Sequence, residues 1–96
     1  MPIQSFKNKE TAAIFDGREV KKVAREIQPL AKTKLQLIDA AKRAEDLRVP
    51  PGNMLEKLGG KRKDQWSIRL NRQWRICFHF DDLTGNASNV EICDYH

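Results

Sequence analysis

Two arginines and the last three residues are the parts of this sequence with the clearest chemical potential. Arg69 and Arg75 carry planar guanidinium groups, which can hold a phosphate through paired hydrogen bonds. The chain ends in Asp94-Tyr95-His96, and each of these side chains can move a proton. Metal-independent RNA cleavage needs such groups: a base for the ribose 2′-hydroxyl, cations for the charge on the phosphate, and an acid for the departing 5′-oxygen.

The net charge of +5 is concentrated in one stretch of the chain. Residues 56–75 contain seven bases and two acids, which leaves eleven of the 18 bases and eleven of the 13 acids for the rest. Concentrated positive charge attracts polyanions, although a solvated basic face explains it equally well. Besides Arg69, the bases that we expect to contact RNA or phosphate are Lys57, Lys61, Arg62, Lys63 and Arg72.

Length and composition predict one small globular domain over residues 1–96, with 40% hydrophobic residues for a single core. No apolar stretch reaches the length of a membrane span or a signal-peptide core, which predicts a cytoplasmic protein. Cys77 and Cys93 fit neither a disulfide framework nor a CxxC motif. A zinc site formed with His79 and His96 is a competing idea, but the spacings match no familiar zinc pattern. We therefore expect no metal and no cofactor.

The first half of the chain is predicted to be helical. Residues 3–6 can form a short edge strand, after which Asn8 can cap a helix that Gly17 ends. Pro29 predicts a break at the residue before it and opens a longer helix. Residues 49–53 (Val-Pro-Pro-Gly-Asn) then end the helical half. The apolar stripe of this half consists of Val23, Ile27, Leu30, Ala31, Leu35, Ile38 and Ala41.

The second half alternates between apolar and polar residues, as strands do. Residues 66–71, 74–81 and 90–93 each place their apolar side chains on one face. The pattern predicts a three-stranded antiparallel meander whose apolar face is covered by the helices. Helices first and strands afterwards predict an α+β domain of two layers.

The register of the first two predicted strands follows from the apolar pattern. A two-residue turn would put Trp74 on the polar face, whereas a three-residue turn over residues 71–73 pairs Leu70 with Trp74. Arg69 then lies directly opposite Arg75. Like charges in this arrangement destabilise a sheet unless something anionic lies between them. The pair is therefore the strongest functional indication in the residues themselves.

The register of the second hairpin is less constrained, because its loop around residues 81–89 is longer. If Phe80 pairs with Val90, then Cys77 faces Cys93 and Arg75 faces Tyr95. The polar face would then present Arg69, Arg75, His79, Glu91 and Tyr95 together.

An ordered series of residues extends from the proline pair to the end of the chain. Its members are Pro50-Pro51-Gly52-Asn53, Leu55-Glu56, Leu58, Gly60, Trp66-Ser67-Ile68-Arg69, Gln73-Trp74-Arg75-Ile76-Cys77-Phe78, Val90-Glu91-Ile92 and Asp94-Tyr95-His96. Through this series the chain resembles the HigB-type killer proteins of bacterial toxin–antitoxin pairs, a branch of the RelE-like toxins. The first half fits more loosely, through Ser5-Phe6 and the pattern from Lys34-Leu35 to Ala40-Ala41.

The resemblance implies a RelE-like fold and a ribosome-dependent endoribonuclease that cuts messenger RNA without a metal and stops translation. It also implies a small helix-turn-helix antitoxin of the HigA type as partner, with DNA contacted only indirectly through the antitoxin complex. By the same resemblance, catalysis falls to Arg75, Asp94, Tyr95 and His96, and Arg69 takes the place of a basic residue on the preceding strand.

One position departs from the family pattern. Some relatives carry a histidine just before the glycine of the strand-linking segment, where this chain has Glu56. If the positions are equivalent, the general base is Glu56, Asp94 or His96. A non-catalytic module with the same fold, which binds RNA or an antitoxin without cutting, is the alternative function.

Overall fold

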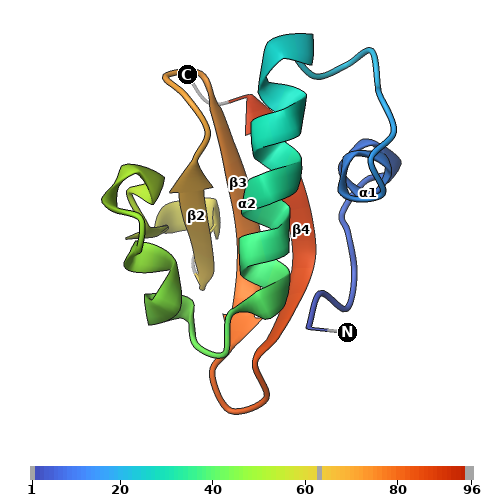
Figure 1. The fold of residues 1–96 in the computed structure, drawn as a ribbon. Helices are drawn as coiled ribbons and strands as arrows, with labels where there is room; N and C mark the ends of the chain where they lie inside the picture. Colours follow the sequence, from blue (N-terminus) through green and yellow to red (C-terminus); the bar gives the residue numbers. More distant parts are fainter. Residues whose placement is uncertain (1, 63, 95–96) are drawn as a thin grey trace.

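The computed structural model describes residues 2–62 and 64–94 (Figure 1). Its α-helices are α1 (Lys9–Phe15) and α2 (Gln28–Ala40), and its strands are β1 (Glu56–Lys57), β2 (Gln65–Arg69), β3 (Trp74–Asp81) and β4 (Asn86–Asp94). Short 3₁₀ turns η1 (Arg25–Ile27), η2 (Ala44–Arg48), η3 (Pro51–Asn53) and η4 (Gly60–Arg62) connect them. None of the helices that the structure describes is long and apolar enough to cross a membrane.

The strands form an antiparallel sheet in the order β1-β2-β3-β4, and α2 lies along one face of it (Figure 1). α1 lies beside α2 on the β4 side. This arrangement confirms the predicted two-layer α+β fold. The fourth strand, β1, was not predicted, because two exposed residues show no alternation of apolar side chains.

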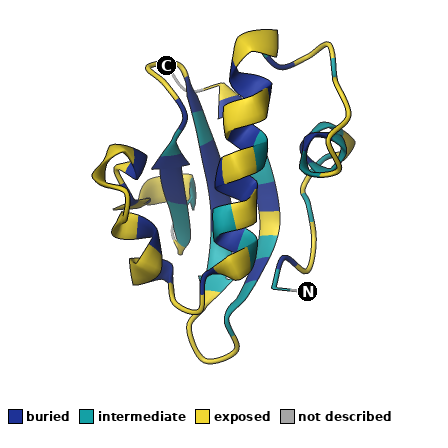
Figure 2. Cartoon of the chain, viewed as in Figure 1, coloured by how far each residue is buried: buried dark blue, intermediate teal, exposed yellow. Residues whose placement is uncertain are grey.

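The main core lies between α2 and the sheet (Figure 2). Ala31, Leu35 and Ile38 of α2 are fully buried there against Ile68 of β2 and Ile76 of β3. They form the predicted apolar stripe, with a spacing of three to four residues.

Leu30 does not belong to this stripe, contrary to the prediction, because it is 40% exposed. It precedes the fully buried Ala31 by one residue, which turns it about 100° away from the core.

The ends of the first helix follow the sequence prediction. Asn8 caps α1 by accepting a hydrogen bond from the backbone N–H of Thr11 at 2.9 Å, and Gly17 follows the helix with a φ of 86°. The predicted strand at residues 3–6 is reduced to two isolated parallel bridges, from Ile3 to Ala87 and from Phe6 to Val90. These bridges place the N-terminal segment along the free edge of β4.

The register of β2 and β3 agrees with the prediction. The backbone N–H of Leu70 donates to the carbonyl of Trp74 at 2.9 Å across a three-residue turn. Ile68 therefore pairs with Ile76, and Arg69 lies opposite Arg75. The two arginines share the face of the sheet that is turned away from α2, which we call the outer face.

The register predicted for β3 and β4 is wrong. Arg75 pairs with Cys93, not with Tyr95, and Phe80 pairs with Ala87. A bulge on β4, where Asn89 has a φ of 51°, inserts one extra residue between the pairs formed by His79 and Cys77. The bulge lets Ala87 and Val90, three residues apart, both face the core, which uninterrupted alternation would forbid.

The outer face is less polar than the alternation predicted. Ser67 and Cys77 lie on it, yet they are 0% and 1% exposed. Leu58, just after β1, packs against Cys77 and Cys93 in a second small apolar cluster. The β1 segment thus covers the middle of the outer face and leaves Arg69 and Arg75 at one end.

Candidate active site: the arginine pair on the outer face

Arg75 is half-buried and held by two hydrogen bonds. Its Nε donates to Ser67 Oγ at 2.9 Å, and its Nη2 donates to the backbone carbonyl of Met54 at 3.0 Å. Both acceptors are uncharged, so they orient the guanidinium and leave its positive charge uncancelled. The Nη1 edge of the same group makes no hydrogen bond to a described residue and can donate to a phosphate oxygen.

Arg69 lies beside Arg75, and it also contacts Met54. Its Nε donates to the carbonyl of Asn71 at 3.0 Å, and its Nη1 contacts Met54 Sδ at 3.5 Å. Neither arginine forms an ion pair with another residue that the structure describes. Two cations therefore face each other across β2 and β3, an arrangement that an anion bound between them would stabilise.

Met54 contacts both arginines, and no pattern in the sequence indicates this role. It has left-handed backbone geometry, with a φ of 46° and a ψ of 55°, and its side chain is 53% exposed. Non-glycine residues disfavour this geometry, and a methionine carries no pattern that would indicate it. Ser67 was correctly placed on the outer face by alternation, but its role as an acceptor for Arg75 depends on a distance that the sequence does not contain.

The structure brings one of the predicted proton-transfer residues to the outer face. Glu56 is exposed, and its pairing with Ser67 puts its side chain on the same face as Arg75. Asp94 pairs with Trp74, so its side chain lies on the other face, at the end of β4, where Gln73 Nε2 donates to it at 3.1 Å. Of the other predicted residues, Tyr95, His96 and Lys63 lie outside the described residues.

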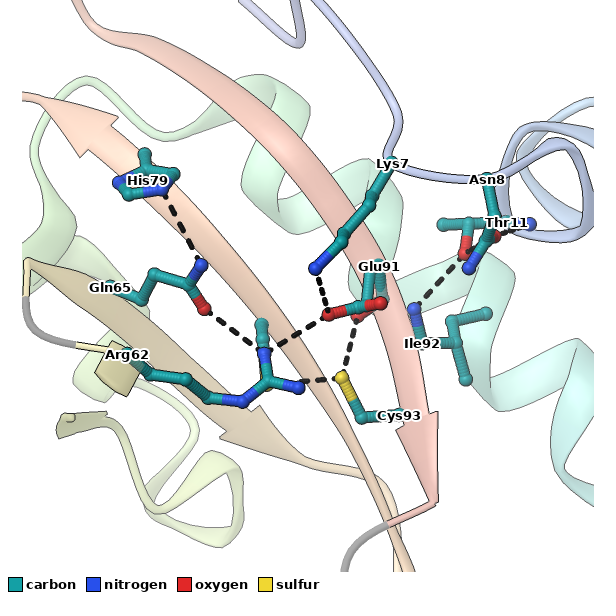
Figure 3. A network of polar contacts seen from close by, with 10 residues as sticks. Lys7, Asn8, Thr11, Arg62, Gln65, His79, Glu91, Ile92 and Cys93 are labelled. Carbon is teal, nitrogen blue, oxygen red and sulfur yellow. Dashed lines mark hydrogen bonds and ion pairs between the residues drawn. The ribbon is translucent and has the colours of Figure 1, made fainter. Parts of the chain in front are cut away.

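The other residues predicted to contact phosphate differ in whether their side chains are already bonded within the protein. Lys61 and Arg72 are exposed. Lys57 lies over the ring of Trp66, 5.5 Å from its centroid, and this pair is on the α2 side of the sheet. Arg62 is engaged within the protein, as Figure 3 shows: its Nη1 donates to Glu91 at 3.0 Å and to Gln65 at 3.2 Å.

A polar network around Glu91 includes Arg62, Lys7, Gln65 and His79 (Figure 3). Lys7 lies 3.7 Å from Glu91, and Gln65 contacts His79 at 3.4 Å. Burial alone would raise the pKa of Glu91, but the hydrogen bond from Arg62 and the charge of Lys7 hold it below its ordinary value. The same hydrogen bond raises the pKa of Arg62. Arg62 is therefore neutralised by Glu91, whereas Arg69 and Arg75 are not.

The two cysteines are adjacent, although they do not pair across the strands as predicted. Cys93 Sγ donates to Cys77 Sγ at 3.3 Å in the cluster with Leu58, and both thiols are free. This hydrogen bond, together with burial, raises the pKa of Cys93. Within residues 2–62 and 64–94, no group of three or more histidine, cysteine, aspartate or glutamate side chains is arranged to hold a metal ion.

Two arginines that form no ion pair with a described residue lie on the open face of a helix-covered antiparallel sheet, and a small α+β protein of this kind is suited to bind a polyanion. Residues 4–96 match the family model for the HigB-like toxins, described as the RelE-like toxin of the type II toxin–antitoxin system HigB. The chain belongs to this family, and membership in a toxin–antitoxin family implies an antitoxin as partner.

Two curated relatives cover nearly the whole chain. Toxin HigB-1 of Vibrio cholerae is 37% identical over 88 residues, which are 91% of this chain and 90% of the relative. Endoribonuclease HigB of Proteus vulgaris is 32% identical over 94 residues, which are 98% of this chain and 99% of the relative.

Proposed function

We propose that this protein is the toxin of a type II toxin–antitoxin pair and that it cleaves messenger RNA on the ribosome, in the cytoplasm, without a metal. The observation that carries the proposal is the pair Arg69 and Arg75, which lie opposite each other on the outer face with no acid among the described residues to neutralise them. The name of the Proteus vulgaris relative, an endoribonuclease, supports the same activity.

In the proposed reaction the two arginines hold the phosphate that is attacked. A base removes the proton of the ribose 2′-hydroxyl, and the 2′-oxygen then bonds to the phosphorus. Arg75 and Arg69 stabilise the additional negative charge on the phosphate oxygens. The bond to the 5′-oxygen breaks, and an acid protonates that oxygen. The products are a 2′,3′-cyclic phosphate and a 5′-hydroxyl.

The proton-transfer groups are drawn from Glu56, Asp94, Tyr95 and His96. Glu56 is favoured as a base by its place on the outer face next to Ser67, which also binds Arg75. The side chain of Asp94 lies on the α2 side of the sheet, opposite to Arg75. In this proposal Asp94 therefore orients the two residues that follow it. Lys61 and Arg72, both exposed, contact the flanking phosphates.

The proposed partners are the ribosome, its messenger RNA and a HigA-like helix-turn-helix antitoxin. DNA is reached only through the antitoxin. A steep dependence of RNA affinity on salt follows from phosphate contacts, because each one releases bound counterions.

The proposal is tested by controlled expression of the wild-type protein and of Arg75→Ala. We expect growth arrest from the wild type and none from Arg75→Ala. The matched control is Arg18→Ala, which removes an exposed arginine that pairs with Asp16 and should leave the arrest intact. Co-purification of each variant with the antitoxin reports that it is folded.

Two results would count against the proposal. Full arrest by Arg75→Ala would remove the site from the mechanism. No arrest from a folded, antitoxin-binding wild type would instead favour a module that binds without cutting.

A further inference from the structure

One lysine of the helix layer is buried without a carboxylate partner among the described residues. Lys34 of α2 is only 9% exposed, and its ammonium donates a hydrogen bond to Oδ1 of Asn53. None of the ion pairs among the described residues includes Lys34. Burial of a charged amine without a carboxylate is unfavourable, and accordingly burial lowers the pKa of Lys34. The hydrogen bond to Asn53 is therefore the contact through which Lys34 can act on the rest of the molecule.

Asn53 is the residue that receives this contact, and it is completely buried. Its Nδ2 donates to the carbonyl of Leu47 at 3.0 Å and lies 3.4 Å from the carbonyl of Val49. Its own backbone N–H donates to the carbonyl of Pro50 at 3.0 Å. The side-chain amide thus joins α2 to the backbone before the turn, at residues 47 and 49, and these contacts leave the asparagine little freedom to rotate.

The residue after Asn53 is Met54, whose left-handed backbone directs its carbonyl to Arg75 and its sulfur to Arg69. Left-handed geometry at a methionine is disfavoured and persists only where neighbouring contacts maintain it. Asn53 directly precedes Met54 in the chain, so its contacts restrain the backbone at Met54. A path therefore runs from Lys34 through a hydrogen bond to Asn53, along the chain to Met54, and through a second hydrogen bond to Arg75.

We propose that Lys34 and Asn53 are positioning residues for the RNA-cleaving site: together they hold Met54 in the left-handed conformation that orients Arg75 toward the phosphate. This inference rests on the proposed function for its effect on cleavage, but the orientation of Arg75 can be measured without it. Neither residue touches RNA. Lys34 lies in the helix layer, on the opposite side of the sheet from the arginine pair.

The decisive variant is Lys34→Met, which keeps the length and apolar stem of the side chain and removes the ammonium. Removing the ammonium ends the unfavourable burial of a charge but leaves the buried Oδ1 of Asn53 without its donor, so the melting temperature should stay the same or fall slightly. The single-turnover cleavage rate on saturating programmed ribosomes should nevertheless fall by roughly 10- to 100-fold, since a misplaced catalytic group slows the chemical step. Affinity for the ribosome should change little. Lys32→Met, on the same helix, is the matched control and should behave as wild type.

The orientation of Arg75 is read directly from the NMR resonance of its Nε–Hε group, assigned by its loss in Arg75→Ala. The hydrogen bond to Ser67 should protect this proton from solvent exchange in the wild type. In Lys34→Met the resonance should shift and its exchange accelerate, whereas the Nε–Hε resonance of Arg62 should not move. Asn53→Ala breaks the same path from the other end, so it should move the same resonance even though it also lowers stability.

The outcomes separate the inference from the function on which it rests. An unmoved Arg75 resonance in both folded variants would overturn the positioning role, whatever the cleavage rates. A displaced resonance with an unchanged cleavage rate would also overturn it. If the wild type cleaves nothing but the resonance moves as expected, the proposed function fails and the structural link from Lys34 to Arg75 stands.

Discussion

Acidic side chains on the outer face are distributed unevenly among its arginines. Glu91 pairs with Arg62 at 3.0 Å, while among the described residues Arg69 and Arg75 donate only to uncharged acceptors. The side chain of Glu91 is 14% exposed, so its charge is partly shielded from water and needs a partner. Arg62 is therefore best understood as a structural residue, and the free positive charge of the face belongs to the arginine pair.

Removal of the Arg62 charge should therefore affect stability in a pH-dependent way. In Arg62→Gln we expect a loss of roughly 0.5–1 kcal/mol in the free energy of unfolding near neutral pH, as for a partly exposed ion pair. The folded-state pKa of Glu91 is lowered, so its ionised form adds stability above the ordinary glutamate pKa, and this contribution disappears as the pH falls through the lowered value.

The measurement is urea denaturation of both proteins at neutral pH and again below the lowered Glu91 pKa. The difference between them should close in acid. Arg18→Gln, which breaks an ion pair whose side chains are 69% and 61% exposed, should show almost no difference at either pH. An Arg62→Gln deficit that persists unchanged in acid would show that Glu91 is not its cause.

At the scale of elements, a single hydroxyl links the first helix to the last strand. Thr11 Oγ1 donates to its own cap residue Asn8 at 2.7 Å and accepts from the backbone N–H of Ile92 at 3.0 Å (Figure 3). Ile92 belongs to β4, and no strand in the described part of the chain lies beside this edge at Ile92. The threonine therefore replaces a missing strand partner for one buried N–H.

Thr11→Val keeps the shape of the side chain but leaves the Ile92 N–H without its acceptor. We expect this variant to lose about 1–3 kcal/mol in the free energy of unfolding, the usual effect of an unsatisfied buried donor. Thr33→Val is the control, because Thr33 is exposed and its hydroxyl only donates to the carbonyl of Pro29 at 3.2 Å. Equal losses from the two variants in urea titrations would contradict the link between α1 and β4.

How far the sequence predicts these elements depends on whether a local pattern records them. The Asn8 cap, the Gly17 end and the three-residue turn before Trp74 follow from residue types at fixed spacing, and all three are present. β1 and the β4 bulge could not be predicted, because their geometry follows from pairing with distant residues. The pairing of Phe80 with Ala87 and the one-residue bulge together give Arg75 the partner Cys93 in place of the predicted Tyr95.

For the molecule as a whole, the sheet separates two tasks. The α2 side supplies the core, with Leu35, Ile38, Ile68 and Ile76 fully buried. The outer face carries the arginine pair. The sequence predicted this division, the Arg69–Arg75 pairing and the excess charge. It did not reveal Met54, Asn53 and Lys34, since their roles depend on one left-handed residue and on contacts 19 residues apart in the chain.

The role proposed for Arg75 in ribosome-dependent cleavage of messenger RNA is measured by primer extension on a defined messenger in a reconstituted translation system. With wild-type protein we expect cuts only when ribosomes are present, and with Arg75→Ala we expect none. Lys32→Met should cut as the wild type does. Cuts that persist in Arg75→Ala would contradict this role of Arg75. The cleavage itself would be contradicted by a messenger that stays intact after treatment with folded wild-type protein that binds its antitoxin.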